Sequence, residues 1–378
     1  MSKVLLGDVV NRIKDTVDKD NTDLEYYIGG EHFDYGEVTI NKKGAIAGST
    51  IGPAFHMRFQ PGDVLLMSRN PHLRKAGMVD FEGICSDVSY VCRTKDENIL
   101  LQDFLPFIFQ SDSFWTFAEK NKKGSTNFFL NWSDFEKYEF ELPDIETQKE
   151  LAEVLWAIND TRKSYISLKQ LTDELVKSQF IEMFRLKTDG NYKPLKECCS
   201  SISGGNTPSM KHPEYYGGQV PFIKSGDVKD DTVSSGALWL TEKALTETTA
   251  KLLPKGTVIV VIRSAALLHE FHTAITLNPV VINQDLKAFQ PKNEYLPEYL
   301  MWSIKVQEDS LLAKVQSVLT SHIEMNDLLN IPVYQSSLEQ QKRFCEFVKQ
   351  HDKAKHELSE SIEKLDLLSK RIIIENIG

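Results

Sequence analysis

The sequence predicts an α+β protein with two similar globular domains in tandem, each followed by a long helix. Three observations support this prediction: the length of 378 residues, an internal repeat with a period of about half the chain, and two long stretches of helical periodicity that lack glycine and proline. A chain of this length typically forms two domains of roughly 100–200 residues each. We expect globular domains at 1–143 and 188–332, and helices at 144–187 and 333–378.

Composition excludes several classes of protein. Hydrophobic residues make up 41% and charged residues 26%, which is typical of folded globular domains. No apolar run approaches the roughly 20 residues of a membrane span, and the five cysteines contain no Cys-x-x-Cys pair. We therefore expect a cytoplasmic protein without disulfides or a zinc ribbon. The net charge of −10 argues against a general polyanion binder, so any nucleic-acid surface must be assembled by folding basic residues onto one face.

The internal repeat pairs two strand segments. Phe59-Gln-Pro-Gly-Asp-Val-Leu-Leu-Met-Ser-Arg69 aligns with Leu253-Pro-Lys-Gly-Thr-Val-Ile-Val-Val-Ile-Arg263, and both segments predict a turn followed by an aliphatic strand. Leu142-Pro143 with Gln148 recurs as Ile331-Pro332 with Gln341, directly before each long helix. The repeat therefore covers both the domains and the starts of the helices.

Each globular domain mixes short strands with one further helix. We expect helices at Asp103–Lys120 and Pro297–Val315 and strands at Val64–Met67, Val88–Cys92, Val258–Ile262 and Val280–Ile282. This mixture predicts an α+β domain that occurs twice.

The long helices carry apolar residues at spacings of three and four, which is typical of a seam for another helix. The seam residues are Leu151, Leu155, Ile158, Tyr165, Leu168, Leu171 and Leu175 in the first helix and Phe344, Val348, Leu358, Ile362, Leu365 and Ile372 in the second. The simplest arrangement packs the two helices against each other; the alternative is that each covers a partner subunit or a separate domain. Apolar residues outside the seams are expected near the domain bases or at a partner surface: Trp156, Phe180, Phe184 and Ile373.

No motif commits the chain to a reaction. It has no P-loop, no Gly-x-Gly-x-x-Gly and no Asn/Asp-Pro-Pro-aromatic methyltransferase motif. His269 and His272 are three residues apart, whereas metalloprotease helices space their histidines by four. We expect no catalytic residue and no metal site.

Binding of DNA suits the polar loops better. Lys and Arg neutralise phosphates, and Arg, Asn, Ser and Thr also reach base edges. An ordinary solvated position is the alternative for each residue, and the loop at Gly204–Pro208 is either a phosphate-binding loop or a plain turn. The candidates are Lys42, Lys43, Arg69, Arg74, Lys75, Lys123, Ser125, Thr126 and Asn127 in the first domain, and Thr207, Lys224, Ser225, Arg263, Ser264, Thr320, Ser321 and His322 in the second.

These features resemble a known family along nearly the whole chain. The second half carries Gly204-Gly-Asn-Thr-Pro208, Glu214-Tyr-Tyr-Gly-Gly218, Val220-Pro-Phe-Ile223, Gly226-Asp-Val228, Gly256-Thr-Val-Ile259, Ile282-Asn-Gln284 and Ser321-His-Ile323 in the family order. The first half lacks the Gly-Gly-Asn-Thr-Pro element and keeps Gly62-Asp-Val-Leu65, Lys123-Gly-Ser-Thr126 and Leu142-Pro143 with Gln148. The chain resembles the specificity (S) subunit of type I restriction-modification systems.

The resemblance implies two target-recognition domains whose long helices form an antiparallel coiled coil. It also implies a non-catalytic subunit that reads a bipartite target in double-stranded DNA and binds no cofactor itself. Two adenine-N6 methyltransferase subunits using S-adenosylmethionine, and restriction subunits using ATP and magnesium, are the implied partners. The alternatives are a self-contained nucleic-acid-modifying enzyme that dimerises through its helices, and a coiled-coil scaffold without a DNA role.

Overall fold

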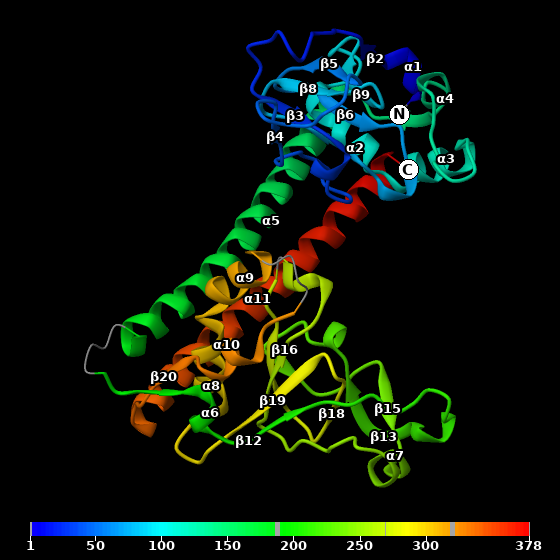
Figure 1. Cartoon of the computed structure of the whole chain (residues 1–378). Helices are drawn as coiled ribbons and strands as arrows, with labels where there is room; N and C mark the ends of the chain where they lie inside the picture. Colours follow the sequence, from blue (N-terminus) through cyan, green and yellow to red (C-terminus); the bar gives the residue numbers. More distant parts are fainter. Residues whose placement is uncertain (1, 186–189, 269, 318–321, 378) are drawn as a thin grey trace. The chain divides into compact units, whose positions relative to one another are not determined.

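The computed structural model describes residues 2–185, 190–268, 270–317 and 322–377 (Figure 1). The chain forms two compact units. Unit 1 comprises Met1–Ser167 and Leu358–Gly378, and unit 2 comprises Leu168–Glu357. Each unit therefore combines a globular part with sections of both long helices.

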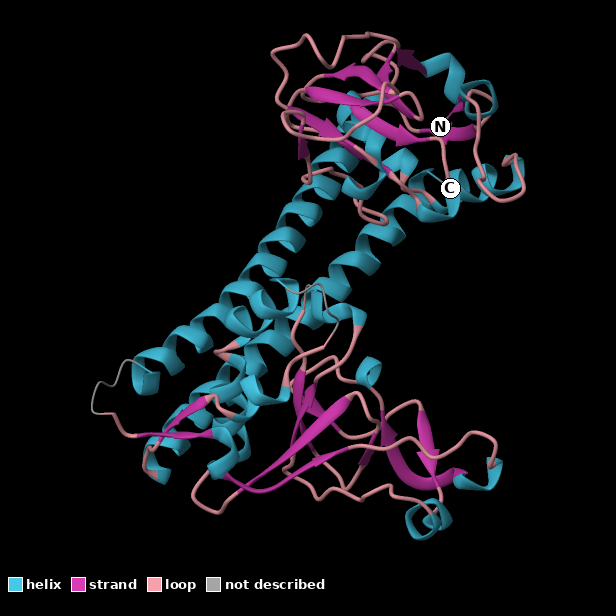
Figure 2. Cartoon of the chain, viewed as in Figure 1, coloured by secondary structure: helices cyan, strands magenta, loops and turns pink. Residues whose placement is uncertain are grey.

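Unit 1 contains two four-stranded sheets and one two-stranded sheet, shown in magenta in Figure 2. The first sheet is antiparallel, with the strand order β2 (Val10–Ile13), β9 (Ser89–Thr94), β6 (Val64–Met67) and β7 (Ala76–Met78). The second has the order β4 (Gly44–Ala45), β3 (Tyr26–Ile28), β8 (Gly83–Ser86) and β5 (Phe55–Phe59), and β3 and β8 are parallel. The two-stranded sheet pairs β1 (Ser2–Leu5) with β10 (Glu139–Leu142).

The described residues of unit 2 form a similar set of sheets, with five strands in the first sheet and three in the second. Its first sheet has the order β12 (Cys199–Gly204), β19 (Leu286–Pro291), β16 (Val258–Val261), β17 (Thr273–Thr276) and β14 (Thr232–Val233), and β14 is parallel to β17. Its second has the order β15 (Leu238–Leu240), β13 (Tyr216–Ile223) and β18 (Val281–Ile282), and β13 and β18 are parallel. The two-stranded sheet pairs β11 (Tyr192–Pro194) with β20 (Pro332–Tyr334).

The central strands β6 and β16 occupy the same position in their sheets and begin 194 residues apart, as the repeat predicts. All four residues of each strand are buried. A strand buried on both faces requires a continuous apolar run, and both Val-Leu-Leu-Met and Val-Ile-Val-Val supply one. The internal repeat therefore corresponds to a repeated α+β fold.

Each predicted shorter helix is split in two. In unit 1, α2 (Leu105–Phe109) ends before α3 (Asp112–Asn121), because Ser111 caps α3 by accepting a hydrogen bond from the Phe114 amide. In unit 2, α8 (Pro297–Lys305) is followed by α9 (Glu308–Ser317). The other short helices are α1 (Leu6–Val9), α4 (Trp132–Phe135), α6 (Leu195–Cys198), α7 (Glu242–Glu247) and α10 (Met325–Leu329).

The two long helices are α5 (Ile145–Phe180), which continues as a π-helical turn over Ile181–Arg185, and α11 (Leu338–Ile377). Each is anchored to its globular part by a glutamine with no exposed surface. The Gln148 amide accepts from the Leu101 N–H at 3.0 Å and donates to the Ile99 and Pro143 carbonyls, both at 2.8 Å. Gln341 makes the equivalent three bonds to the Leu296 N–H and the Glu294 and Ser336 carbonyls.

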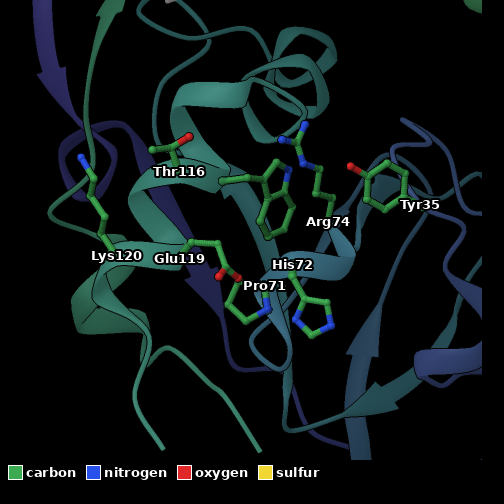
Figure 3. Close-up of a pocket in the computed structure, with 8 residues that line it drawn as sticks. Tyr35, Pro71, His72, Arg74, Thr116, Glu119 and Lys120 are labelled. Carbon is green, nitrogen blue, oxygen red and sulfur yellow. The ribbon is translucent and has the colours of Figure 1, made fainter.

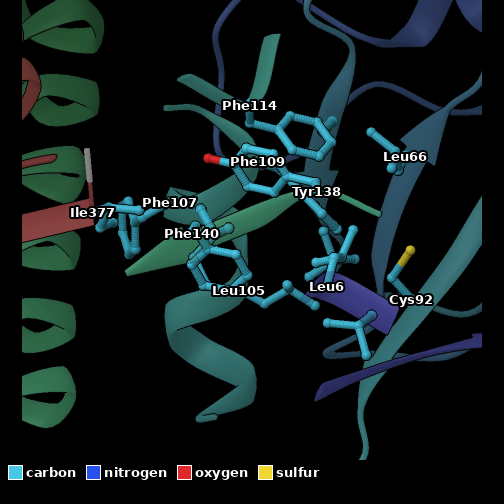
Figure 4. Packing of buried hydrophobic residues seen from close by; sticks show 14 of the residues in the cluster. Leu6, Leu66, Cys92, Leu105, Phe107, Phe109, Phe114, Tyr138, Phe140 and Ile377 are labelled. Atoms are coloured by element: carbon cyan, nitrogen blue, oxygen red, sulfur yellow. The ribbon is translucent and has the colours of Figure 1, made fainter. Parts of the chain in front are cut away.

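Sections of both long helices contribute to the core of each unit. In unit 1, Leu155 of α5 and Ile373 and Ile377 of α11 belong to one buried cluster with the aromatic residues of α2 and α3 (Figure 4). In unit 2, Val176 and Phe180 of α5 belong to one cluster with Phe344 and Val348 of α11. Ion pairs accompany this packing, from Arg162 Nε to Asp366 at 2.6 Å in unit 1 and from Lys355 to Asp173 at 2.5 Å in unit 2.

The predicted seam is wrong for three residues of α5. Leu168, Leu171 and Leu175 are 49%, 54% and 50% exposed, so none of them is buried in a seam. The buried positions of this section are instead Thr172, Val176 and Phe180, which lie on a different face of the helix. The apolar positions after Tyr165 therefore mark a change of face and not a continued seam.

The described residues contain five free, buried cysteines and no helix long and apolar enough to cross a membrane. No group of three or more His, Cys, Asp or Glu residues in the described ranges is arranged to hold a metal ion. Of the two histidines of the sequence His269-Glu-Phe-His272, His272 lies with its Nε2 atom 3.1 Å from Oε2 of Glu270. His269 lies outside the described residues.

Candidate nucleic-acid interface

Arg69 and the loop at 123–129 lie together in unit 1. Arg69 follows the central strand β6 and pairs in a short bridge with Phe129, while the Asn70 N–H donates to the Phe128 carbonyl at 2.9 Å. The loop is closed by two hydrogen bonds between Lys123 and Phe129, and its turn uses a positive φ of 91° at Gly124. The tertiary structure therefore pairs Arg69 with the loop that carries Ser125, Thr126 and Asn127, all of which are exposed.

Unit 2 builds the same arrangement from the matching residues. Arg263 follows the central strand β16 and pairs in a short bridge with His322, and the Ile323 N–H donates to the Ile262 carbonyl at 2.8 Å. The bridge partners are 60 residues apart in unit 1 and 59 in unit 2. Of the predicted neighbours, Thr320 and Ser321 lie outside the described residues, and His322 lies 2.9 Å from Glu324.

Arg69 and Arg263 are exposed, and within the described ranges neither side chain has an ion-pair partner. Lys123 differs, because its ammonium donates to Asp134 at 2.7 Å. That hydrogen bond holds the pKa of the Asp134 carboxyl below its usual range. The two arginines therefore present their guanidinium groups to solvent at equivalent points of the two units.

Most other predicted basic residues of unit 1 are engaged within the unit. Lys42 lies 2.6 Å from Asp34, and the Lys43 ammonium lies 3.6 Å from the centre of the Tyr26 ring. Lys75 donates to the Gly30 carbonyl at 2.6 Å, and Arg74 forms an ion pair with Asp112. These side chains differ from Arg69, because each already has a partner within its own unit. Arg74 is paired through Nη1 alone, so its other guanidinium N–H groups remain for a second acceptor.

In unit 2, Thr207 donates to the exposed Gln284 side chain at 2.5 Å. The loop that carries Thr207 packs tightly: a Cβ atom at Gly205 would lie 2.0 Å from the Asn283 carbonyl oxygen. Close packing of the two backbone segments explains why position 205 is a glycine. It agrees with the interpretation of Gly204–Pro208 as a plain turn. Gln284 belongs to the motif Ile282-Asn-Gln284, but sequence reasoning did not select it as a site residue.

The remaining predicted residues of unit 2 lie at turns. Lys224 and Ser225 begin the 3-10 turn at Ser225–Asp227, where Asp227 accepts from the Lys224 N–H at 2.8 Å. Ser264 accepts from the Ala266 N–H at 3.2 Å. Both turns place polar side chains at partly exposed positions.

The predicted partner-binding residues lie mostly in the cores of the units. Phe180 and Phe184 are 4% and 1% exposed in the unit 2 core, and Ile373 is 7% exposed in the unit 1 core. Trp156 is half-buried and donates its indole N–H to the Asp103 carbonyl at 2.9 Å. Phe180, Phe184 and Ile373 therefore pack near the domain bases, the first of the two expected places. The domains themselves cover these side chains, which does not agree with their prediction as a partner surface.

Comparison with known proteins identifies the fold and the family. The type I restriction modification DNA specificity domain matches twice, at residues 3–170 and 189–365. The MjaIX specificity subunit of Methanocaldococcus jannaschii is 28% identical over 48% of this chain and 43% of its own length. The EcoR124I/EcoR124II specificity subunit of Escherichia coli is 26% identical over 42% of this chain and 40% of its own length. The matches thus span less than half the length of these two type I restriction enzyme subunits.

Two solved structures share the fold. One, described as showing complex assembly and conformational transition of a type I restriction-modification system, has a TM-score of 0.59 at 19% identity over 99% of this chain and 97% of the other. The S subunit from M. genitalium has a TM-score of 0.56 at 14% identity over 100% of this chain and 96% of the other. With two matches to one domain family covering nearly all of its length, the chain belongs to the type I restriction-modification DNA specificity family.

Proposed function

We propose that the chain reads a bipartite double-stranded DNA target, with one half-site contacted by each unit. The repeated placement of Arg69 and Arg263, each exposed at the end of a buried central strand, carries this proposal. An arginine can donate two hydrogen bonds to the O6 and N7 atoms of guanine in the major groove. The side chains around the two arginines differ, so the half-sites differ and the target is asymmetric.

The chain acts in this proposal as a recognition subunit without catalytic residues or a cofactor of its own. The matched family is defined by DNA specificity, and the two curated relatives are specificity subunits of restriction enzymes. Two methyltransferase subunits would methylate adenine N6 with S-adenosylmethionine, and restriction subunits would use ATP and magnesium.

The exposed face of α5 is the proposed docking surface for a methyltransferase subunit. Leu168, Leu171 and Leu175 follow one another at spacings of three and four, so they form one stripe along the helix. Each leucine is about half exposed, and a contiguous apolar stripe on a soluble protein marks an interaction site. This surface replaces the one predicted at Phe180, Phe184 and Ile373.

The long helices are proposed to form an antiparallel coiled coil that sets the distance between the half-sites. Two contacts support this direction: in unit 1 the early residue Arg162 of α5 meets the late residue Asp366 of α11, and in unit 2 the later residue Asp173 of α5 meets the earlier residue Lys355 of α11. An antiparallel pair relates the two reading domains by a pseudo-twofold axis, which matches the local symmetry of duplex DNA.

Sequencing of methylated bases in cells with and without the gene tests the proposal. We expect methylated adenines at one asymmetric, bipartite sequence that disappear when the gene is deleted and return when it is supplied on a plasmid. An unchanged methylation pattern, in cells where the methyltransferase gene is expressed, would contradict the proposed function.

A further inference from the structure

A hollow of about 470 Å³ lies in unit 1 between the 3-10 turn at Pro71–Leu73 and helix α3. Figure 3 shows Arg74 and Tyr35 on one side of the hollow and Lys120 and Thr116 on the other. The lining residues are Tyr35, Pro71, His72, Arg74, Trp115, Thr116, Glu119 and Lys120. Of these, Trp115 is 2% exposed, which provides a rigid aromatic wall.

The hollow adjoins the proposed DNA surface of unit 1. Pro71 is two residues beyond Arg69, and Lys120 is three residues before Lys123 at the start of the loop at 123–129. The Asn70 N–H, between Arg69 and Pro71, donates to the Phe128 carbonyl of that loop at 2.9 Å. A DNA strand whose base contacts Arg69 therefore passes within reach of the hollow.

Two cations of the hollow are suited to bind an anion. Asp112 pairs with Nη1 of Arg74, so the other guanidinium N–H groups remain for a second acceptor. Lys120 is exposed, and no carboxylate of the described residues pairs with it. The neighbouring Glu119 carboxylate pairs through Oε2 with Lys122 at 2.6 Å, and its buried Oε1 has no hydrogen-bond partner among the described residues.

The backbone of this turn is unusual. Asn70 and Arg74, the residues that flank the 3-10 turn, have φ values of 52° and 45°. Residues other than glycine seldom adopt this left-handed conformation, and such strain concentrates at binding sites where surrounding structure maintains it. Here the Leu73 N–H to Asn70 and the Arg74 N–H to Pro71 hydrogen bonds, at 2.9 and 3.0 Å, close the turn and fix the position of Arg74.

We propose that this hollow is a phosphate-binding site for the DNA backbone, in which Arg74 and Lys120 neutralise phosphodiester groups beside the base read by Arg69. This inference rests on the proposed function and adds a separate role to it, because backbone contacts hold the duplex in place without reading its sequence. At the repeat offset of 194 residues, the positions of unit 2 that match 70–74 are Ser264, Ala265, Ala266, Leu267 and Leu268, which are uncharged, and Leu268 takes the place of Arg74. The proposed phosphate-binding site is therefore a feature of unit 1, which contacts the first half-site of the DNA, and not of unit 2.

The experiment compares Arg74→Gln and Lys120→Gln with Arg58→Gln, a control of equal charge change on β5, where Arg58 pairs with Glu82 at 3.2 Å. The full chain, purified with its methyltransferase subunits, is titrated with a duplex carrying its target and with one whose half-sites are scrambled. Each lost phosphate contact is expected to lower the slope of log K against log salt by about 0.9, which is about fivefold in affinity at 0.15 M salt. Both duplexes should weaken equally, and the control should not change.

Each outcome decides the inference. Unchanged salt slopes in both variants would overturn it, as would a loss confined to the target duplex, which indicates base reading. Inorganic phosphate at constant ionic strength that binds in the hollow without displacing DNA would assign the hollow to a free phosphate ion and overturn the inference. Lys120→Gln should unfold at the wild-type temperature, so it decides the question if Arg74→Gln misfolds. A wild-type complex without preference for any target would contradict the proposed function itself.

Discussion

Replacement of Gln148 by leucine tests how the long helix α5 is anchored to unit 1. The side chain has no exposed surface and makes three hydrogen bonds of 2.8 to 3.0 Å with the Leu101 N–H and the Ile99 and Pro143 carbonyls. Leucine fills similar space but leaves all three backbone groups without this partner. A buried polar group that loses its partner costs about 1–3 kcal/mol. Relaxation of the loop residues that Gln148 contacts recovers part of this free energy. We expect the free energy of unfolding to fall by about 2–4 kcal/mol.

Thermal unfolding measures this loss. For a domain of this size, 1 kcal/mol corresponds to about 2–4 °C in Tm, so the fall should be roughly 5–15 °C. Gln341→Leu should have an effect of the same size, because Gln341 makes the equivalent three bonds in unit 2. Gln170→Leu, at an exposed position of α5, is the matched control and should change Tm little. If Gln148→Leu and Gln341→Leu unfold within about 2 °C of this control, the anchoring argument is refuted.

Three further predictions concern recognition, docking and pH. Arg69→Gln and Arg263→Gln should each weaken binding at one half-site by about 1–3 kcal/mol, measured with duplexes altered in one half-site at a time, and an equal loss on all sequences would show phosphate contacts only. Leu171→Glu should abolish co-purification with the methyltransferase subunit at an unchanged Tm, whereas retained binding would remove the stripe from the interface. The carboxyl of Asp134 has a lowered pKa in the folded state, so it stabilises the protein above the ordinary carboxyl pKa of about 3.9, and this stability is lost as the pH falls. Asp134→Asn should therefore be less stable than wild type at neutral pH by about 1 kcal/mol or less, and the difference in urea unfolding should vanish in acid; a constant difference would contradict the assignment.

Local patterns in the sequence were sufficient to predict the repeated α+β architecture. The runs Val64–Met67 and Val258–Val261 are apolar without interruption. A strand that is buried on both faces requires apolar residues at successive positions. The spacing of Arg69 and Arg263 and of Gln148 and Gln341 could likewise be read from the repeat, since each pair sits at a fixed point of the same fold. Long stretches without glycine or proline were enough to place both helices.

Tertiary structure alone decided which faces are covered. Leu168, Leu171 and Leu175 have the spacing of a helix seam, yet they are exposed, while Phe180 and Phe184, which follow on the same helix, are buried. Helical periodicity shows that a face is apolar but does not show what covers it, because the covering residues come from segments more than a hundred positions away. The hollow beside Arg74 has the same origin. Its walls come from a turn at 71–73 and a helix at 112–121, and only the packing of these two elements places Arg74 and Lys120 around one hollow.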